Sequence, residues 1–129
     1  MKHLHTSILM IASAAVLGLA GLSALFYPKE ILLASGLPVK ALPVLFVQIA
    51  GALYLGFAMM NWMAKSVLIG GIYARPLGMG NFFHFMIGGI SLIKVSISHP
   101  AWSAAWVAAA FYSIFALLFG WVLFGIPKK

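Results

Sequence analysis

The residues best suited to chemistry lie in an apolar stretch over residues 77–98. Polar or small residues recur there at spacings of 3, 4, 3 and 7, namely Asn81, His84, Gly88, Ser91 and Ser98. Such spacings place residues on one side of a helix, and a polar stripe in a membrane helix faces a bundle interior or a water-filled cavity. Two interpretations stay open: hydrogen bonds between helices, or a cavity that binds a lipid, a quinone or another small ligand.

Three further polar residues are candidates for the same ligand site. Asn61 and Arg75 are expected near the same side of the membrane as Asn81 and His84. Gln48 and Ser91 are expected near the opposite side. The predicted ligand-binding residues are therefore Asn81, His84, Ser91, Gln48, Asn61 and Arg75.

His84 also raises the question of haem or metal binding, because a histidine within the membrane can ligate haem iron. A second haem ligand at matching depth would have to be His5 or His3, since His99 belongs to the opposite side. The chain has no cysteine, which excludes thiolate metal centres and disulfides. No cofactor is evident, and haem or quinone remains an alternative without direct support.

Groups for catalysis are scarce in this sequence. Glu30 is the only acidic residue, so neither paired carboxylates nor a Ser-His-Asp arrangement can form. Gly78-Met79-Gly80 lacks the residues that complete a phosphate-binding glycine motif. These observations argue against an enzyme.

The composition identifies the class of protein. Of the 129 residues, 64% are hydrophobic and 7% are charged, whereas soluble domains carry about 25% charged residues. The chain is therefore predicted to be an integral membrane protein in contact with the lipid bilayer. Its net charge of +7 comes from basic residues scattered singly, mostly at the ends of apolar runs, where they can reach lipid headgroups. This pattern argues against nucleic-acid binding.

Four apolar segments are long enough to cross a hydrocarbon core of about 30 Å, at about residues 7–27, 41–63, 77–98 and 101–126. Because a spanning segment must satisfy its own backbone hydrogen bonds, apolar runs without alternation predict helices. We expect one all-α domain over residues 1–129, a transmembrane four-helix bundle with short loops. The first segment could instead be a cleaved signal peptide ending near Ala20, but its apolar run continues to Tyr27, which favours a retained span.

The connections between these segments suggest the topology. Pro28 and Gly36 bracket a short predicted helix in the membrane interface, and His99-Pro100 predicts a tight turn between antiparallel neighbours. Four spans put both termini on one side, with five basic residues against three on the other: Lys2, Lys65, Arg75, Lys128 and Lys129 against Lys29, Lys40 and Lys94. The positive-inside rule then favours cytoplasmic termini, with dual topology left open.

Small residues recur at four-residue spacing in three of the predicted spans. They are Ala14 and Gly18, Ala52 and Gly56, and Ala101, Ala105 and Ala109. Such faces allow helix backbones to approach closely. They predict packing within one bundle or, alternatively, an interface with a second protomer or a partner protein.

Two stretches carry a resemblance to a known family. The first contains Phe26-Tyr27-Pro28-Lys29-Glu30, Ile31-Leu32-Leu33 and the turn Gly36-Leu37-Pro38, and the second contains Gly51-Ala52-Leu53-Tyr54-Leu55-Gly56 and Asn61-Trp62. With these motifs the chain resembles the small four-helix bacterial membrane proteins of the broad DoxX-like kind. The resemblance implies a four-helix bundle in a bacterial cytoplasmic membrane, with a quinone-linked or partner-subunit role. The chain departs from a redox core because it lacks cysteine and a clear histidine pair.

From these observations we expect a non-catalytic integral membrane protein, either an accessory or scaffold subunit of a larger membrane complex or a homo-oligomer. The alternative is a carrier or channel for a small ligand that uses the polar stripe of the third span.

Overall fold

The structure is a computed structural model that describes residues 2–69 and 71–125, with residues 2–4 described by their backbone alone. All regular elements in this part of the chain are helical: α1 (Lys2–Phe26), α2 (Pro28–Ala34), α3 (Ala41–Met63), α4 (Arg75–Ser98), α5 (Ser103–Gly120) and the π-helix η1 (Trp121–Gly125). The predicted all-α fold is confirmed, and four of these helical segments are long and apolar enough to cross a membrane.

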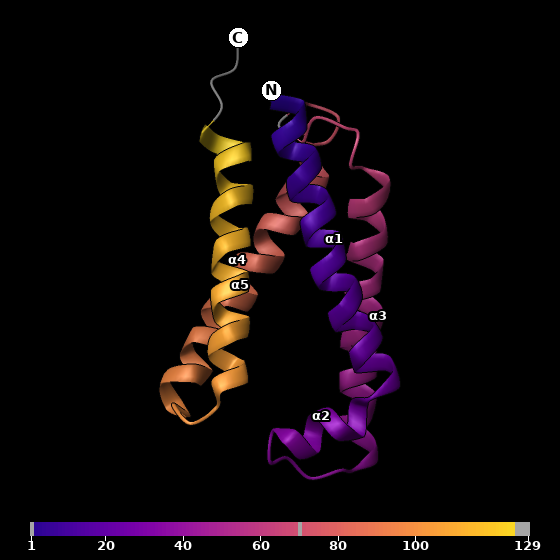
Figure 1. Cartoon of the computed structure of the whole chain (residues 1–129), viewed down its shortest axis with the longest axis vertical. Coiled ribbons are helices and arrows are strands. Elements are labelled where there is room, and N and C mark those ends of the chain that lie inside the picture. Colours follow the sequence, from indigo (N-terminus) through magenta and orange to yellow (C-terminus); the bar gives the residue numbers. More distant parts are fainter. Residues whose placement is uncertain (1, 70, 126–129) are drawn as a thin grey trace. The chain divides into compact units, whose positions relative to one another are not determined.

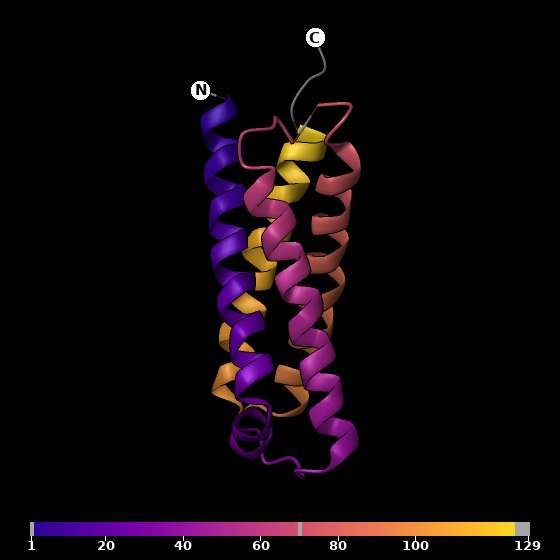
Figure 2. The ribbon, with the colours of Figure 1, turned by 90° about the vertical axis from the view of Figure 1, so that its right-hand side faces the viewer.

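The described chain forms two compact units. One unit, Ser7–Ser66, contains most of α1 together with α2 and α3, and the other contains the start of α1 up to Thr6 together with α4, α5 and η1. Figure 1 shows α1 and α3 side by side with α2 at their shared end, and it shows α4 beside α5. Figure 2 shows that α1 and α3 run in opposite directions.

A proline and a glycine set the limits of α2. Pro28 occupies the first turn of the helix, and its ring disfavours the helical conformation at Tyr27, where α1 has ended. After the helix, Gly36 adopts a φ of 69°, and the amides of Gly36 and Leu37 donate to the carbonyls of Leu33 and Leu32 over 3.0 and 2.9 Å. These two bonds form a Schellman motif, which requires a left-handed residue and so favours glycine. The predicted short helix is confirmed.

A pair of glycines lies at a close contact between α1 and α3. A Cβ on Gly21 would lie 2.8 Å from the Gly51 carbonyl oxygen, and a Cβ on Gly51 would lie 2.9 Å from the Gly21 carbonyl oxygen. No side chain fits between backbones at this separation. Three turns further along, the Asn61 amide donates to the buried Ser13 hydroxyl over 2.9 Å.

The α1–α3 contact differs in part from the predicted small-residue faces. On α1 the prediction holds, since Ala14 is buried and a Cβ on Gly18 would lie 3.7 Å from the Ala58 Cβ. On α3 the contact runs instead through Gly51 and Ala58, and both Ala52 and Gly56 are exposed. Because α3 has a glycine at both position 51 and position 56, either of these two faces of the helix could have packed against α1. The Gly21 contact and the Asn61 hydrogen bond select the face that carries Gly51.

The helices α4 and α5 are antiparallel neighbours, as the predicted turn requires (Figure 1). The turn spans 99–102, and the Trp102 amide donates to the His99 carbonyl over 3.0 Å. The rings of His99 and Trp102 stack with their centroids 4.7 Å apart. Outside the turn, Gly78 lies against Leu123 of η1 and Gly89 against Tyr112 of α5, so glycines again set the contact.

Most helix ends lie within two residues of the predicted limits, but α1 begins at Lys2, five residues before the predicted start at residue 7. The third helical span begins at Arg75 rather than residue 77, because Pro76 fits the first turn, where its missing N–H is not needed. The fourth begins at Ser103 and continues through η1 to Gly125. The predicted end at Ile126 and the cationic residues Lys128 and Lys129 lie outside the described residues.

Candidate functional site

The buried line of α4 does not follow the whole predicted polar stripe. Its buried residues are Gly78, Asn81, Phe85, Gly89 and Ser96. Gly78 and Ser96 are 18 residues apart, about five turns at 3.6 residues per turn, so this line runs straight along the helix. The predicted stripe covers 17 residues in four steps, from Asn81 to Ser98. This is about a quarter turn short of five full turns, so the stripe drifts around the helix by that amount. Only Asn81 belongs to both lines.

The serines of the predicted stripe lie on the exposed side of α4. The Ser91 hydroxyl donates to the Ile87 carbonyl over 3.0 Å, and the Ser98 hydroxyl donates to the Lys94 carbonyl over 3.1 Å. This bond to the preceding turn is a common way to satisfy a serine within a membrane helix. Ser96, which the stripe omitted, is the buried one, and its hydroxyl donates to the Leu92 carbonyl over 2.8 Å.

Asn81 and His84 lie one turn apart on α4 and are the two predicted site residues that the structure brings close together. Asn81 is fully buried, and its side-chain amide donates to the Leu77 carbonyl over 3.0 Å. His84 is half-buried, and its Nε2 lies 3.3 Å from the Tyr112 hydroxyl of α5. Which of these two atoms donates depends on the histidine tautomer.

Sequence reasoning missed Tyr112 as the partner of His84. A Cβ on Gly88 would lie 2.6 Å from Cε1 of the tyrosine ring, so Gly88 provides the space that the ring fills. Gly88 and His84 are four residues apart and therefore neighbours on one face of α4. The sequence did contain one indication of this contact. Gly88 lies one turn from the polar His84, and a glycine at such a position leaves room for a large side chain from the facing helix.

Phenylalanines surround the His84–Tyr112 pair. The ring of Phe85 stacks on those of Phe115 and Phe119, with centroids 4.9 and 5.8 Å away, and meets the Tyr112 ring edge to face at 5.2 Å. Aromatic pairs at such separations stabilise a contact beyond their buried area. The pair therefore lies beside a packed aromatic core between α4 and α5.

The other three predicted ligand-binding residues are spread along their helices. Gln48 and Asn61 both belong to α3, but 13 residues put them about 20 Å apart along the axis. Gln48 is half-buried, whereas Asn61 is buried and bonded to Ser13. Arg75 is half-buried at the start of α4, about 24 Å along the helix from Ser91. Within each unit, the predicted residues therefore do not form a single site.

The α3 helix carries a regular line of exposed residues on the side away from α1. We call this line the α3 seam, and its members are Leu42, Leu45, Ile49, Ala52, Gly56, Met59 and Met63, all exposed. Their spacings alternate strictly between 3 and 4 residues, the heptad pattern by which two helices pack in a left-handed coil. At about 100° per residue, the α3 seam lies opposite the buried line of Gly51, Ala58 and Asn61.

Metal-binding groups of the usual kinds do not gather in this structure. Among the described residues, no group of three histidine, cysteine, aspartate or glutamate side chains could hold a metal ion.

At the end of α3, the Lys65 ammonium lies 3.5 Å from the centroid of the Trp62 ring. This cation–π contact holds the positive charge at the end of the span.

No protein-family model, curated protein or solved structure matches the chain. The interpretation of the site therefore depends on the geometry of the described residues themselves.

Proposed function

We propose that this protein is a non-catalytic integral membrane protein that assembles side by side with another membrane helix through the α3 seam. It would be an accessory or scaffold subunit of a larger complex, or a homo-oligomer. The observation that carries this proposal is the unbroken alternation of 3 and 4 residues along an exposed face of α3.

The composition of the α3 seam supports helix packing rather than mere contact with lipid. Ala52 and Gly56 lie at its centre, and a Cβ on Gly56 would meet no atom within 4 Å. Small residues in the middle of a membrane helix let a second backbone approach, and the resulting van der Waals contact drives association in lipid. Larger side chains at both ends, such as Leu45 and Met59, would act as the knobs of a heptad interface.

The polar contacts within each unit support a structural role. The buried side-chain nitrogen and oxygen atoms of the described residues all have hydrogen-bond partners. Asn61 bonds to Ser13 across α1 and α3, and His84 bonds to Tyr112 across α4 and α5. Bonds of this kind between membrane helices contribute about 0.6 kcal/mol each.

The resemblance to DoxX-like proteins supports the same role by analogy. It favours a bacterial cytoplasmic membrane and an association with other membrane subunits. Cytoplasmic termini follow from the positive-inside rule applied to four spans.

Native mass spectrometry of the full chain, extracted gently from its own membrane, tests the proposal. Gly56→Ile and Ala52→Ile place a branched side chain in the centre of the α3 seam and are expected to convert the assembly to single chains. Ala15→Ile makes the matched change at an exposed residue of α1 and should leave the assembly intact. Single chains from the unaltered protein, or equal assembly in all variants, would contradict the proposal.

A ligand carrier is the second candidate, and the His84–Tyr112 pair is the observation that favours it. A histidine and a phenol bonded to each other inside a span could exchange that bond for one to a small ligand, such as a quinone or a lipid headgroup. The same spectra would then show a reproducible added mass. Asn81→Leu should remove that mass with the fold intact, whereas a packing role predicts that His84→Ala lowers stability and changes no ligand signal.

A further inference from the structure

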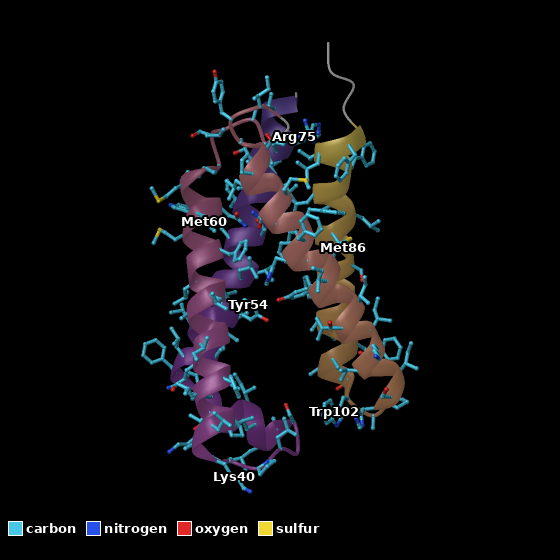
Figure 3. All side chains as sticks on the ribbon, turned by 180° about the vertical axis from the view of Figure 1, so that it is seen from behind. Lys40, Tyr54, Met60, Arg75, Met86 and Trp102 are labelled. Atoms are coloured by element: carbon cyan, nitrogen blue, oxygen red, sulfur yellow. The ribbon has the colours of Figure 1, made fainter. Side chains whose placement is uncertain are left out.

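Three of the seven methionines of the chain fall within five residues at the end of α3. Met59, Met60 and Met63 are all exposed, to 60%, 46% and 73%. Figure 3 shows that the Met60 side chain projects away from the ribbon. We call these three residues the methionine cluster.

The spacing of the methionine cluster lets its three sulfur atoms converge. Met63 follows Met59 by four residues and Met60 by three, so it is a surface neighbour of both, with Cβ atoms roughly 5–6 Å apart. At about 100° per residue, Met63 lies between the other two around the helix axis. Each side chain has three rotatable bonds, which is enough freedom to direct all three thioethers toward one point.

The position of the cluster makes that point accessible to a dissolved ion. Met63 is the last residue of α3, and Ala64, Lys65 and Ser66 follow in a turn. The Lys65 charge is held over the Trp62 ring, which places the cation on an aromatic face. The aliphatic members of the α3 seam lie nearer its start, so the soft sulfur ligands are gathered where the span ends.

We propose that the methionine cluster binds one soft monovalent metal ion of the Cu(I) class through three thioether sulfurs. Thioethers are soft, neutral ligands, and soft ligands select Cu(I) over the hard and borderline divalent ions. The chain has no cysteine to compete for such an ion. The three ligands come from a single helix, so one chain suffices to form the site. Met59 and Met63 also belong to the α3 seam, so the ion binds a chain in which this end of the seam is uncovered.

The first test follows the methionine methyl groups directly. The full chain, labelled with ¹³C at the methionine methyls and held in detergent micelles, is titrated with Ag(I), a soft monovalent ion that does not change oxidation state under these conditions. We expect the resonances of Met59, Met60 and Met63 to shift together and to saturate at one ion per chain. Unshifted resonances, or shifts that never saturate or that fall on Met10, Met79 or Met86, would overturn the proposal.

The second test measures affinity for Cu(I) itself, kept reduced by ascorbate and competed against a coloured Cu(I) chelator. Met63→Leu removes the central ligand with little change in side-chain volume and should weaken Cu(I) binding at least about tenfold. Loss of a residue that only supports a metal ligand usually costs about that much, and loss of the ligand itself should cost more. Met86→Leu is the matched control, because Met86 is half-buried on α4. Equal affinities of the two variants would show that the methionine cluster holds no ion.

Discussion

At the scale of single residues, two glycines of α3 illustrate how context decides the effect of one substitution. Gly51 and Gly56 belong to the same apolar helix, but a Cβ on Gly51 would lie 2.9 Å from the Ala24 Cβ and from the Gly21 carbonyl oxygen. A Cβ on Gly56 would meet nothing within 4 Å. The same added methyl group is therefore expected to have opposite consequences at the two positions.

We expect Gly51→Ala to destabilise the α1–α3 pair by about 1–3 kcal/mol, since overpacking displaces backbone as well as side chains. Gly56→Ala should be neutral or stabilise the helix by up to about 1 kcal/mol, because alanine is the better helix former. Thermal unfolding in detergent, followed by circular dichroism, measures both. Equal losses in the two variants would contradict the contact between Gly21 and Gly51.

The hydroxyl of Tyr112 provides a second prediction at this scale. Tyr112→Phe removes the bond to His84 and keeps the ring that fills the space above Gly88. The expected loss of stability is about 0.6 kcal/mol, the typical value for a hydrogen bond between membrane helices. Chemical unfolding in mixed micelles can measure this loss. A double-mutant cycle with His84→Ala should return a coupling energy of the same size, and zero coupling would show that the two side chains do not interact.

At the scale of the elements, local sequence signals proved sufficient where one residue dominates the backbone. Pro28 separates α1 from α2, and Gly36 ends α2 with a positive φ of 69°. Both effects act over a few residues and need no knowledge of the rest of the chain. Faces of helices are different, because Ala52/Gly56 and Gly51/Ala58 are equally small, and only the partner helix distinguishes them.

The Schellman motif at the end of α2 predicts a local response to substitution. Gly36→Ala forces a side chain into the left-handed region, at a cost of about 1–2 kcal/mol. We expect faster hydrogen exchange at the amide of Leu37, whose bond to the Leu32 carbonyl closes the motif. Gly36→Asn should change this exchange less, because asparagine tolerates the same conformation. Unchanged protection in Gly36→Ala would contradict this account.

At the scale of the whole molecule, the long apolar helices and the exposed apolar surface both suit a lipid bilayer. Four helical segments are long and apolar enough to span a bilayer, and many of their large apolar side chains are exposed. In lipid, this exposure carries no hydrophobic cost, and helices associate instead through close packing and hydrogen bonds. The α3 seam has the small central residues that such packing requires.

Single introduced cysteines test the orientation, since the chain has none of its own. Lys40→Cys precedes α3 and Ser66→Cys follows it, and both positions are exposed. With cytoplasmic termini, an impermeant thiol reagent should label Lys40→Cys in intact cells and should reach Ser66→Cys only after the membrane is opened. The reverse pattern would invert the orientation, and labelling of both in intact cells would indicate dual topology.

The sequence alone predicted an all-helical chain with four apolar spans, and it placed most of the described helix limits within two residues. Long apolar runs without alternation can span a bilayer only as helices, and proline, glycine and short polar turns end those helices locally. It also placed Asn81 and His84 on one stripe of the third span, and in the structure Asn81 is buried and His84 half-buried. Only the tertiary structure identified Tyr112 as the partner of His84, turned Ser91 outward and left Ala52 and Gly56 uncovered. These outcomes depend on which of several similar helix faces meets a neighbour, and that choice is made by contacts such as Gly21–Gly51 between residues far apart in the chain.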